Sequence, residues 1–228
     1  MDTPETPGST IEEFETSGPR PPSAGDTIAV LLHGRGSDKN DLQGLRRLVP
    51  DTWTLVTPRA VHAGAPWGYG PGWAWYRYLE DDRVDPATLD ASLSALDHFL
   101  DALPRHLGGP VDRIVLGGFS QGGTTSLAYA LSRPERVRAV LNFSGFLAGG
   151  VSLDNVAEAP PIFWGHGLHD PAIPHALAVR GRAALADAGA TLTTADPAIG
   201  HGIVPEEVEA AVAMVEDVNG RARPPRTR

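Results

Sequence analysis

Residues 113–124 read RIVLGGFSQGGT, and this stretch decides the fold. The apolar run 114–116 precedes a Gly-x-Ser-x-Gly motif centred on Ser120, and a helical pattern follows from Thr124 to Leu131. In a sharp turn between a buried strand and a helix, glycines permit close backbone approach while the serine hydroxyl is exposed. An incidental serine in a glycine-rich turn is the alternative, and the flanking strand and helix argue against it. We therefore predict that Ser120 is a catalytic nucleophile.

Short apolar runs alternate with helical patterns on both sides of this motif. Continuous apolar runs of this length are typical of strands that are buried on both faces of a parallel sheet. The alternation predicts an α/β fold: a mostly parallel sheet with helices on both faces and no large cap domain. The expected strands are 27–32, 53–57, 113–119, 139–143, 162–165 and 191–195, and the expected helices are 41–48, 86–103, 121–132, 175–188 and 205–218.

The two ends of the chain differ in composition from the rest. Residues 1–26 are rich in Pro, Thr, Ser, Glu and Gly, which predicts a flexible extension, although residues 11–15 are apolar enough to add an edge strand. Residues 221–228 contain four arginines and Pro224-Pro225, which predicts a disordered tail. One folded domain is therefore expected over residues 27–220.

Charge and composition narrow the classes of function. The formal net charge of −9 disfavours nucleic acid and anionic membranes as partners. The chain has no cysteine, and no apolar stretch approaches the roughly 20 residues of a membrane span, so no disulfide and no stable membrane insertion are expected. Neither is a secretory signal visible, which makes a cytoplasmic location the expectation. The oligomeric state is expected to be a monomer or a homodimer.

A serine nucleophile of this type needs a histidine base and an acidic partner, in the chain order Ser, Asp or Glu, His. His201 lies in a glycine-flanked loop between the last predicted strand and the last helix, so it can reach the end of the central strand. Asp170 follows strand 162–165 and can fix the imidazole's orientation. Asp154, after the preceding strand, is the main rival for the acid, whereas Asp196 is better placed to cap a turn.

The histidines near Asp170 allow a second interpretation, a metal site. His166, His169 and Asp170 could form a cluster with His33 or His175. Two histidines three residues apart in a loop are weak evidence without a helix to align them. No metal and no cofactor are therefore expected.

Two further segments point to substrate contacts. Glycines 34 and 36 free the backbone around Arg35, so its N–H is expected to form an oxyanion hole with the N–H of Gln121. Residues 67–78 are rich in glycine and follow no clean period, so a loop is expected there. This loop holds three of the five tryptophans and three of the four tyrosines, which suggests the wall or lid of an apolar pocket. A long loop packed on the core by its own side chains is the alternative. Ser144, at another strand end, is expected in a turn or pocket wall. The substrate-binding residues expected are Trp73, Trp75, Phe146 and Ile173.

Five motifs occur in a characteristic order: LLHGRGSD at 31–38, WAWY at 73–76, GFSQGG at 118–123, GLHDPAIP at 167–174 and GHGI at 200–203. With them the chain resembles the phospholipase/carboxylesterase family of α/β hydrolases, from about residue 27 to residue 218. The resemblance implies Ser120, Asp170 and His201 as the triad and the N–H groups of Arg35 and Gln121 as the oxyanion hole. Arg77 stands where many members have an aspartate, which is more similar to the short bacterial branch than to the acyl-protein thioesterases.

The expected function is therefore a serine carboxylesterase that hydrolyses small-to-medium apolar acyl or aryl esters through an acyl-enzyme. An acyl-thioesterase or a lysophospholipase is the alternative with the same triad. A lyase or acyltransferase on that triad also stays open. A non-catalytic binding protein of the same fold is the rival from another class, and it predicts the loss of a triad member.

Overall fold

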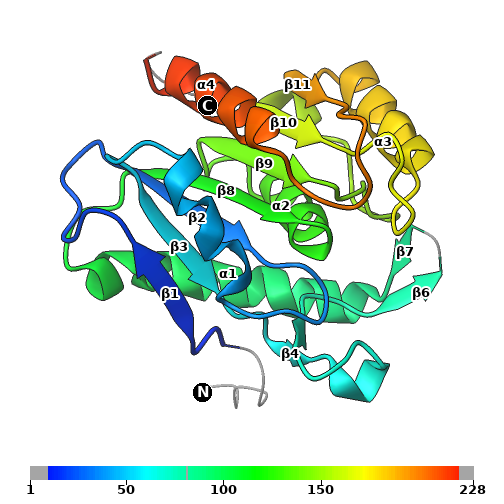
Figure 1. Cartoon of the computed structure of the whole chain (residues 1–228), viewed down its shortest axis with the longest axis horizontal. Coiled ribbons are helices and arrows are strands. Elements are labelled where there is room, and N and C mark those ends of the chain that lie inside the picture. Colours follow the sequence, from blue (N-terminus) through cyan, green and yellow to red (C-terminus); the bar gives the residue numbers. More distant parts are fainter. Residues whose placement is uncertain (1–9, 81, 221–228) are drawn as a thin grey trace.

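The computed structural model describes residues 10–80 and 82–220 (Figure 1). The expected tail at 221–228 and the first nine residues of the expected extension lie outside the described residues. The strands are β1 (Phe14–Ser17), β2 (Thr27–Leu32), β3 (Thr54–Pro58), β4 (His62–Ala63), β5 (Trp73–Ala74), β6 (Tyr78–Glu80), β7 (Arg83–Val84), β8 (Arg113–Phe119), β9 (Ala139–Phe143), β10 (Ile162–Gly165) and β11 (Leu192–Ala195). The α-helices are α1 (Pro86–Leu107), α2 (Gln121–Ser132), α3 (His175–Asp187) and α4 (Pro205–Gly220), and the 3-10 helices are η1 (Asp41–Leu48), η2 (Ala65–Trp67) and η3 (Val156–Glu158).

Seven of these strands form one sheet in the order β1-β3-β2-β8-β9-β10-β11. All neighbours in it are parallel except β1 and β3, which pair antiparallel. β4–β5 and β6–β7 form two small two-stranded sheets beside it. The predicted architecture, a mostly parallel sheet with helices, is confirmed.

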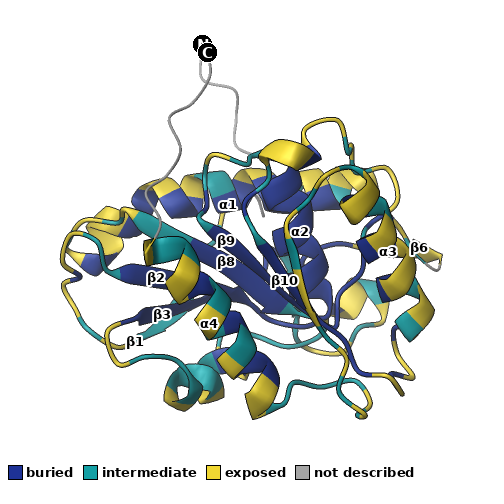
Figure 2. Ribbon diagram, turned by 90° about the horizontal axis from the view of Figure 1, so that it is seen from above, coloured by how far each residue is buried: buried dark blue, intermediate teal, exposed yellow. Residues whose placement is uncertain are grey.

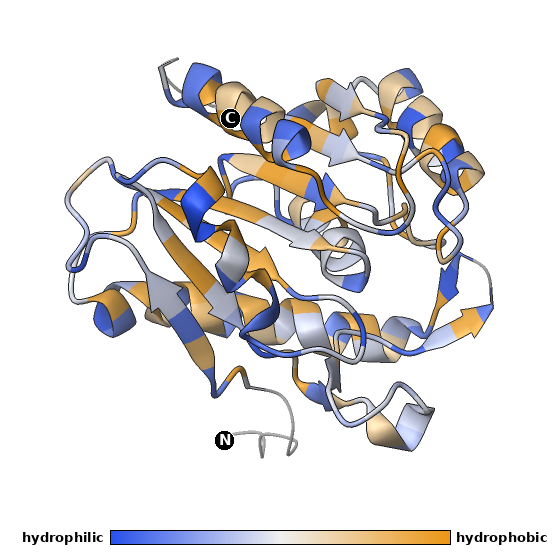
Figure 3. Ribbon diagram, viewed as in Figure 1, coloured by the Kyte–Doolittle hydropathy of each residue, from blue (hydrophilic) through white to orange (hydrophobic). Residues whose placement is uncertain are grey.

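Side chains alternate between the two faces of the sheet because successive residues of a strand point in opposite directions. One apolar core includes Ile28, Val30 and Leu32 of β2 and packs under α1, α2 and α3. The other includes Ala29 and Leu31 and packs under η1 and α4. Figure 2 shows the sheet as a dark, buried layer between helices with exposed outer surfaces, and the same strands are strongly apolar in Figure 3. The strands are therefore covered on both faces.

Several element bounds differ from those expected. α1 runs on to Leu107, past Pro104, and ends at Gly108, whose left-handed backbone (φ 74°) and N–H bond to the Pro104 carbonyl close the last turn. The segment 41–48 is a 3-10 helix. Within the expected N-terminal extension, Phe14–Ser17 forms β1 at the edge of the sheet. The aromatic segment 67–78, expected as a loop, includes β5 and the start of β6.

Candidate active site

Ser120 occupies the tight turn between β8 and α2 at the carboxyl end of the sheet. Its backbone has φ 54° and ψ −114°, a conformation that non-glycine residues rarely adopt. Its N–H donates to the Phe143 carbonyl at 2.8 Å, which ties the turn to β9. A Cβ on Gly118 or Gly122 would lie 2.5 or 2.0 Å from the Leu32 carbonyl oxygen, so only glycine fits at either position. The motif therefore forms the strained elbow that the sequence predicts.

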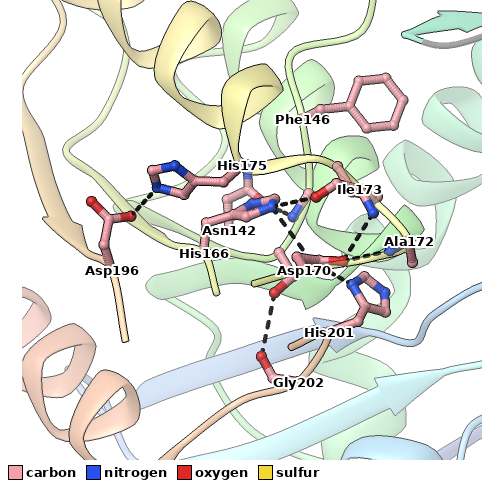
Figure 4. A network of polar contacts seen from close by, with 12 residues as sticks. Asn142, Phe146, His166, Asp170, Ala172, Ile173, His175, Asp196, His201 and Gly202 are labelled. Carbon is pink, nitrogen blue, oxygen red and sulfur yellow. Dashed lines mark hydrogen bonds and ion pairs between the residues drawn. The ribbon is translucent and has the colours of Figure 1, made fainter. Parts of the chain in front are cut away.

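His201 and Asp170 form a hydrogen-bonded pair. The Nδ1–H of His201 donates to Oδ2 of Asp170 at 2.6 Å, which leaves Nε2 as the unprotonated ring atom of a neutral imidazole (Figure 4). The other carboxylate oxygen accepts from the N–H groups of Ala172 and Ile173 at 2.8 and 2.9 Å. The imidazole also packs against the Phe119 ring, with 4.7 Å between ring centroids. Acid and base are thus held in one orientation.

The environment of Asp170 keeps its carboxylate charged. Burial raises the pKa of this group, but the hydrogen bonds from His201, Ile173 and Ala172 outweigh burial, so the pKa lies below its usual value. The ionised carboxylate can stabilise a positive charge on the neighbouring imidazole. This is the electrostatic arrangement that a histidine base requires.

A cavity of about 700 Å³ lies beside Ser120 and His201, and both residues line it. One part of its wall is polar or charged and comes from Arg35, Ser37, Asp41, Asp82 and Arg180. The rest is largely apolar and comes from Gly34, Tyr78, Phe119, Phe146, Ala172, Ile173, Pro174, Ala176 and Leu177. A mixed cavity with an apolar wall beside a serine and an imidazole suits an ester with an apolar acyl or alcohol part.

The expected substrate-binding residues separate into two pairs. Phe146 and Ile173 line the cavity, whereas Trp73 and Trp75 are absent from its described lining. Trp75 is fully buried and its indole N–H donates to the His33 carbonyl at 3.0 Å. Trp73 lies under the Arg59 guanidinium, 3.8 Å from the ring centroid. Neither tryptophan therefore lines this cavity, and their rings instead contact His33 and Arg59 within the protein.

Tyr78, Phe119 and Leu177 also line the cavity, although none of them was expected individually as a wall residue. Tyr78 comes from the predicted aromatic segment and Phe119 from the serine motif itself, so both lay within segments with a signal. Leu177 comes from the first turn of α3, and no pattern in the sequence sets it apart from other helical leucines.

The two residues expected to supply oxyanion N–H groups come from different segments near the serine. Arg35 lines the cavity in the loop after β2, and Gln121, fully buried, is the first residue of α2. The Gln121 amide is held at both ends: its oxygen accepts from the Trp75 N–H at 2.8 Å, and its nitrogen donates to the Tyr76 carbonyl at 2.7 Å. The side chain of Gln121, next to Ser120 in the chain, is therefore fixed at both ends.

The rival acids have other surroundings. Asp154 is exposed and accepts from the Ser152 hydroxyl at 2.8 Å. Asp196 pairs with Arg182 at 2.7 Å and with His175 at 2.9 Å. Among described residues, only Asp170 is hydrogen-bonded to His201.

Two of the histidines considered as metal ligands lie near each other: the ring centroids of His166 and His175 are 5.9 Å apart, and His166 Nε2 lies 3.5 Å from Asp170 Oδ2 (Figure 4). His166 is buried, its Nε2–H donates to the Ile173 carbonyl at 2.9 Å, and burial lowers its pKa. His169 is exposed, and His175 bonds to Asp196. Over residues 10–80 and 82–220 there is no group of three or more His, Cys, Asp or Glu side chains able to hold a metal ion.

Ser144 lies in a buried turn directly after β9. Its backbone also has a positive φ, of 55°, and its hydroxyl donates to the Gly202 carbonyl at 3.3 Å, next to His201 in the chain. It is absent from the described lining of the cavity, so the prediction of a turn position fits and that of a wall position does not.

Comparison with known sequences gives a consistent result. The sequence model described as phospholipase/carboxylesterase matches residues 19–219. Acyl-protein thioesterase 1 of Neurospora crassa is 27% identical over 202 residues, which cover 79% of this chain and 82% of that protein. A probable carboxylesterase of Oryza sativa subsp. japonica is 32% identical over 205 residues, which cover 84% of this chain and 77% of that protein.

Solved structures agree with the fold. The esterase PE8 superposes with a TM-score of 0.68 at 30% identity, covering 90% of this chain and 99% of its own. Acyl-protein thioesterase 2 of Zea mays has a TM-score of 0.76 at 22% identity, covering 91% and 99%. The described residues include no helix with the length and apolar character needed to cross a membrane.

Proposed function

Because this chain belongs to the phospholipase/carboxylesterase family, we propose that it is a serine carboxylesterase in which Ser120 is the nucleophile, His201 the base and Asp170 the orienting acid. Family and relatives together indicate a hydrolase of ester or thioester bonds. The observation that carries the finer assignment is the 2.6 Å bond between His201 and Asp170 at a cavity that Ser120 also lines.

The proposed reaction has two halves. In the first, His201 Nε2 takes the proton of the Ser120 hydroxyl as the serine oxygen bonds to the ester carbonyl carbon. The N–H groups of Arg35 and Gln121 stabilise the negative oxygen, and the alcohol leaves with the proton from His201. In the second, a water molecule gives a proton to His201 as its oxygen bonds to the acyl carbon. His201 then returns that proton to the serine oxygen as the bond to the acyl group breaks, which releases the acid and the free serine. Asp170 stays ionised throughout.

The proposed substrates are esters with small-to-medium apolar acyl or aryl groups, in keeping with the apolar part of the cavity wall. A thioesterase is the second candidate, since several relatives are acyl-protein thioesterases, among them the one from Neurospora crassa. The two candidates share every catalytic step and differ only in the leaving group. An acyl thioester assayed beside the matching oxygen ester therefore separates them.

Three substitutions test the assignment. Ser120→Ala should lower kcat for p-nitrophenyl butyrate by at least about 10³-fold, because the triad acts as a unit. Asp170→Asn should lower it by a similar order, since an amide orients the imidazole in the wrong tautomer. Asp154→Asn is the matched control, an exposed aspartate changed in the same way, and should keep wild-type kcat.

Circular dichroism and the melting temperature, measured on all three variants, separate loss of chemistry from loss of fold. Near-wild-type turnover of both esters and thioesters in folded Ser120→Ala would contradict the proposal. No turnover of any acyl substrate by the wild type would favour the binding protein of the same fold.

A further inference from the structure

Trp75 is a buried residue with an unusual number of polar contacts. It lies between β5 and β6, and its side chain is completely shielded from solvent. Its indole N–H donates to the His33 carbonyl at 3.0 Å, and its ring packs against the His33 imidazole with 5.5 Å between centroids. Buried tryptophans generally find a partner for this N–H, but the partner here lies in the loop that leads to Arg35.

The backbone of Trp75 is equally well held. Its N–H donates to the side-chain oxygen of Gln121 at 2.8 Å, and its carbonyl accepts from the Ser92 hydroxyl at 2.5 Å. The Gln121 amide nitrogen donates to the Tyr76 carbonyl at 2.7 Å, so the Gln121 side chain forms hydrogen bonds on both sides of the Trp75–Tyr76 peptide. Trp75 is thereby bonded to both segments that carry a proposed oxyanion donor.

The loop after β2 shows how this contact reaches the donor atom. His33 Nδ1–H donates to the Gly34 carbonyl at 2.7 Å, and that carbonyl belongs to the same planar peptide group as the Arg35 N–H. The imidazole Nε2 accepts from the Ala60 N–H at 3.0 Å, which fixes the ring and its tautomer. Trp75 holds the carbonyl of the preceding peptide. The direction of the Arg35 N–H is therefore set by His33, and the position of His33 is set in part by Trp75.

We propose that Trp75 is a positioning residue that keeps the Arg35 and Gln121 N–H groups aimed at one point. This inference rests on the proposed function. Trp75 is absent from the described lining of the cavity, so it acts on the oxyanion and not on the bound acyl chain. Donors that are loosely aimed stabilise the transition state less while leaving ground-state binding unchanged, which lowers kcat and spares KM.

The test compares two tryptophan-to-phenylalanine variants. Trp53 is equally buried, but it packs in the core on the other face of the sheet, and its indole N–H donates to Glu216 Oε1 at 2.9 Å. Trp75→Phe and Trp53→Phe each remove one buried indole hydrogen bond. We expect Trp75→Phe to lower kcat for p-nitrophenyl butyrate by about tenfold or more, because a single oxyanion donor is worth about 10²–10³-fold. KM should stay within about twofold, and Trp53→Phe should keep the wild-type kcat.

A transition-state analogue provides an independent readout. The carbonyl carbon of an alkyl trifluoromethyl ketone bonds to the serine oxygen, the serine proton passes to the histidine, and the former carbonyl oxygen carries the negative charge in the oxyanion hole. Its inhibition constant should rise in Trp75→Phe by the same factor as kcat falls. In Trp53→Phe it should not change.

The inference is overturned if both variants lose the same kcat, or if Trp75→Phe raises KM and leaves kcat unchanged. Should Trp75→Phe fail to fold, Ser92→Ala takes its place, since it removes only the hydroxyl that holds the Trp75 carbonyl. A fall of about threefold in kcat with constant KM supports the inference, and an unchanged kcat overturns it. Wild-type protein that neither turns over acyl substrates nor binds the ketone would overturn the proposed function first, and the inference with it.

Discussion

Two serines at neighbouring strand ends, Ser120 and Ser144, carry a positive φ. Such a backbone costs a non-glycine residue about 1–3 kcal/mol and persists only where its surroundings over-determine it. For Ser120 the surroundings are the bond to Phe143 and the close contact of Gly118 and Gly122 with the Leu32 carbonyl. The side chain at the elbow is thus held by backbone packing, whatever residue stands there. This is why a substitution at Ser120 should remove the chemistry without unfolding the chain.

At the scale of one residue, we expect Phe146 to influence which acyl chains the cavity accepts. It is buried in the cavity wall beside Tyr78, with 6.0 Å between ring centroids. Each buried methylene is worth about 0.8 kcal/mol, so kcat/KM should rise about fourfold per methylene until the pocket is full. We expect the optimum between about C4 and C8 p-nitrophenyl esters, and Phe146→Ala should move it to longer chains by opening the wall.

The control is Phe99→Ala, which deletes a buried phenyl ring from the core near Phe14, away from the cavity. That variant should lose stability and keep the wild-type chain-length optimum. A wild-type preference for C16 esters over C4 esters would show that the short-pocket interpretation is wrong.

The proposed triad could be assigned from the sequence because each of its members lies in a local motif. Gly-x-Ser-x-Gly, a strand-end aspartate and a glycine-flanked histidine are readable without knowing the fold in detail. The pocket wall could not be predicted in this way, because its residues are distant in the sequence: Tyr78, Phe146 and Leu177 come from three separate segments. Composition alone does not distinguish an aromatic side chain in a pocket wall from one in the core, and Trp75 is an example of the latter.

At the scale of elements, β1 is the part added outside the parallel arrangement. It pairs antiparallel with β3, and Phe14 packs against the rings of Phe99 and His106 at 5.4 and 5.0 Å. Lys39 bridges Glu13 and Glu15 at 3.2 and 3.0 Å, although such half-exposed pairs contribute little. The stabilising effect of β1 therefore comes mainly from Phe14 and the backbone ladder.

Removal of residues 1–9 should leave the melting temperature unchanged, because that stretch has few apolar side chains to bury. Removal of residues 1–17 should lower it by several degrees, since it deletes β1. Phe14→Ala in the full chain should cost about 2 kcal/mol, less than a fully buried phenylalanine because Phe14 is half-buried. The melting temperatures are measured by differential scanning calorimetry. Equal values for the two truncations would show that β1 contributes nothing to stability.

Element type was predictable wherever hydrophobic periodicity was strong, and bounds were not. The helix was expected to end at residue 103, directly before Pro104, but α1 continues to Leu107. The absent N–H of Pro104 removes one hydrogen bond, but the Gly108 cap and the burial of Leu107 keep the last turn helical. Tertiary packing of this kind cannot be read from a window of sequence.

For the whole molecule, three histidines shielded from solvent make the stability depend on pH near neutrality. Burial lowers the pKa of His33, His62 and His166 below the usual value near 6.5. Between pH 6.5 and these lowered values, the unfolded chain binds protons that the folded chain does not. The free energy of unfolding must therefore fall as the pH falls below about 6.5, and should be constant with respect to these groups above it.

We expect the melting temperature to fall between pH 7 and pH 5.5. His166→Gln keeps a donor for the Ile173 carbonyl and removes the titration, so its curve should be flatter than that of the wild type. His98→Gln, at an exposed site, should follow the wild-type curve. Buried Glu207 acts in the opposite direction because burial raises its pKa, so the comparison of variants isolates the histidine effect. A His166→Gln curve as steep as that of the wild type would count against this account.

The order of the strands has a consequence for how the protein is made. A ribosome synthesises Ser120 before Asp170 and Asp170 before His201. The elbow rests on β2, β8 and β9, so it can be completed by a nascent chain in which β10 and β11 are still missing. His201 lies in the loop after β11, so it is synthesised later. If the domain folds progressively during translation, the unfinished chain carries Ser120 without His201, so under the proposed mechanism it cannot hydrolyse an ester until the loop after β11 has been synthesised.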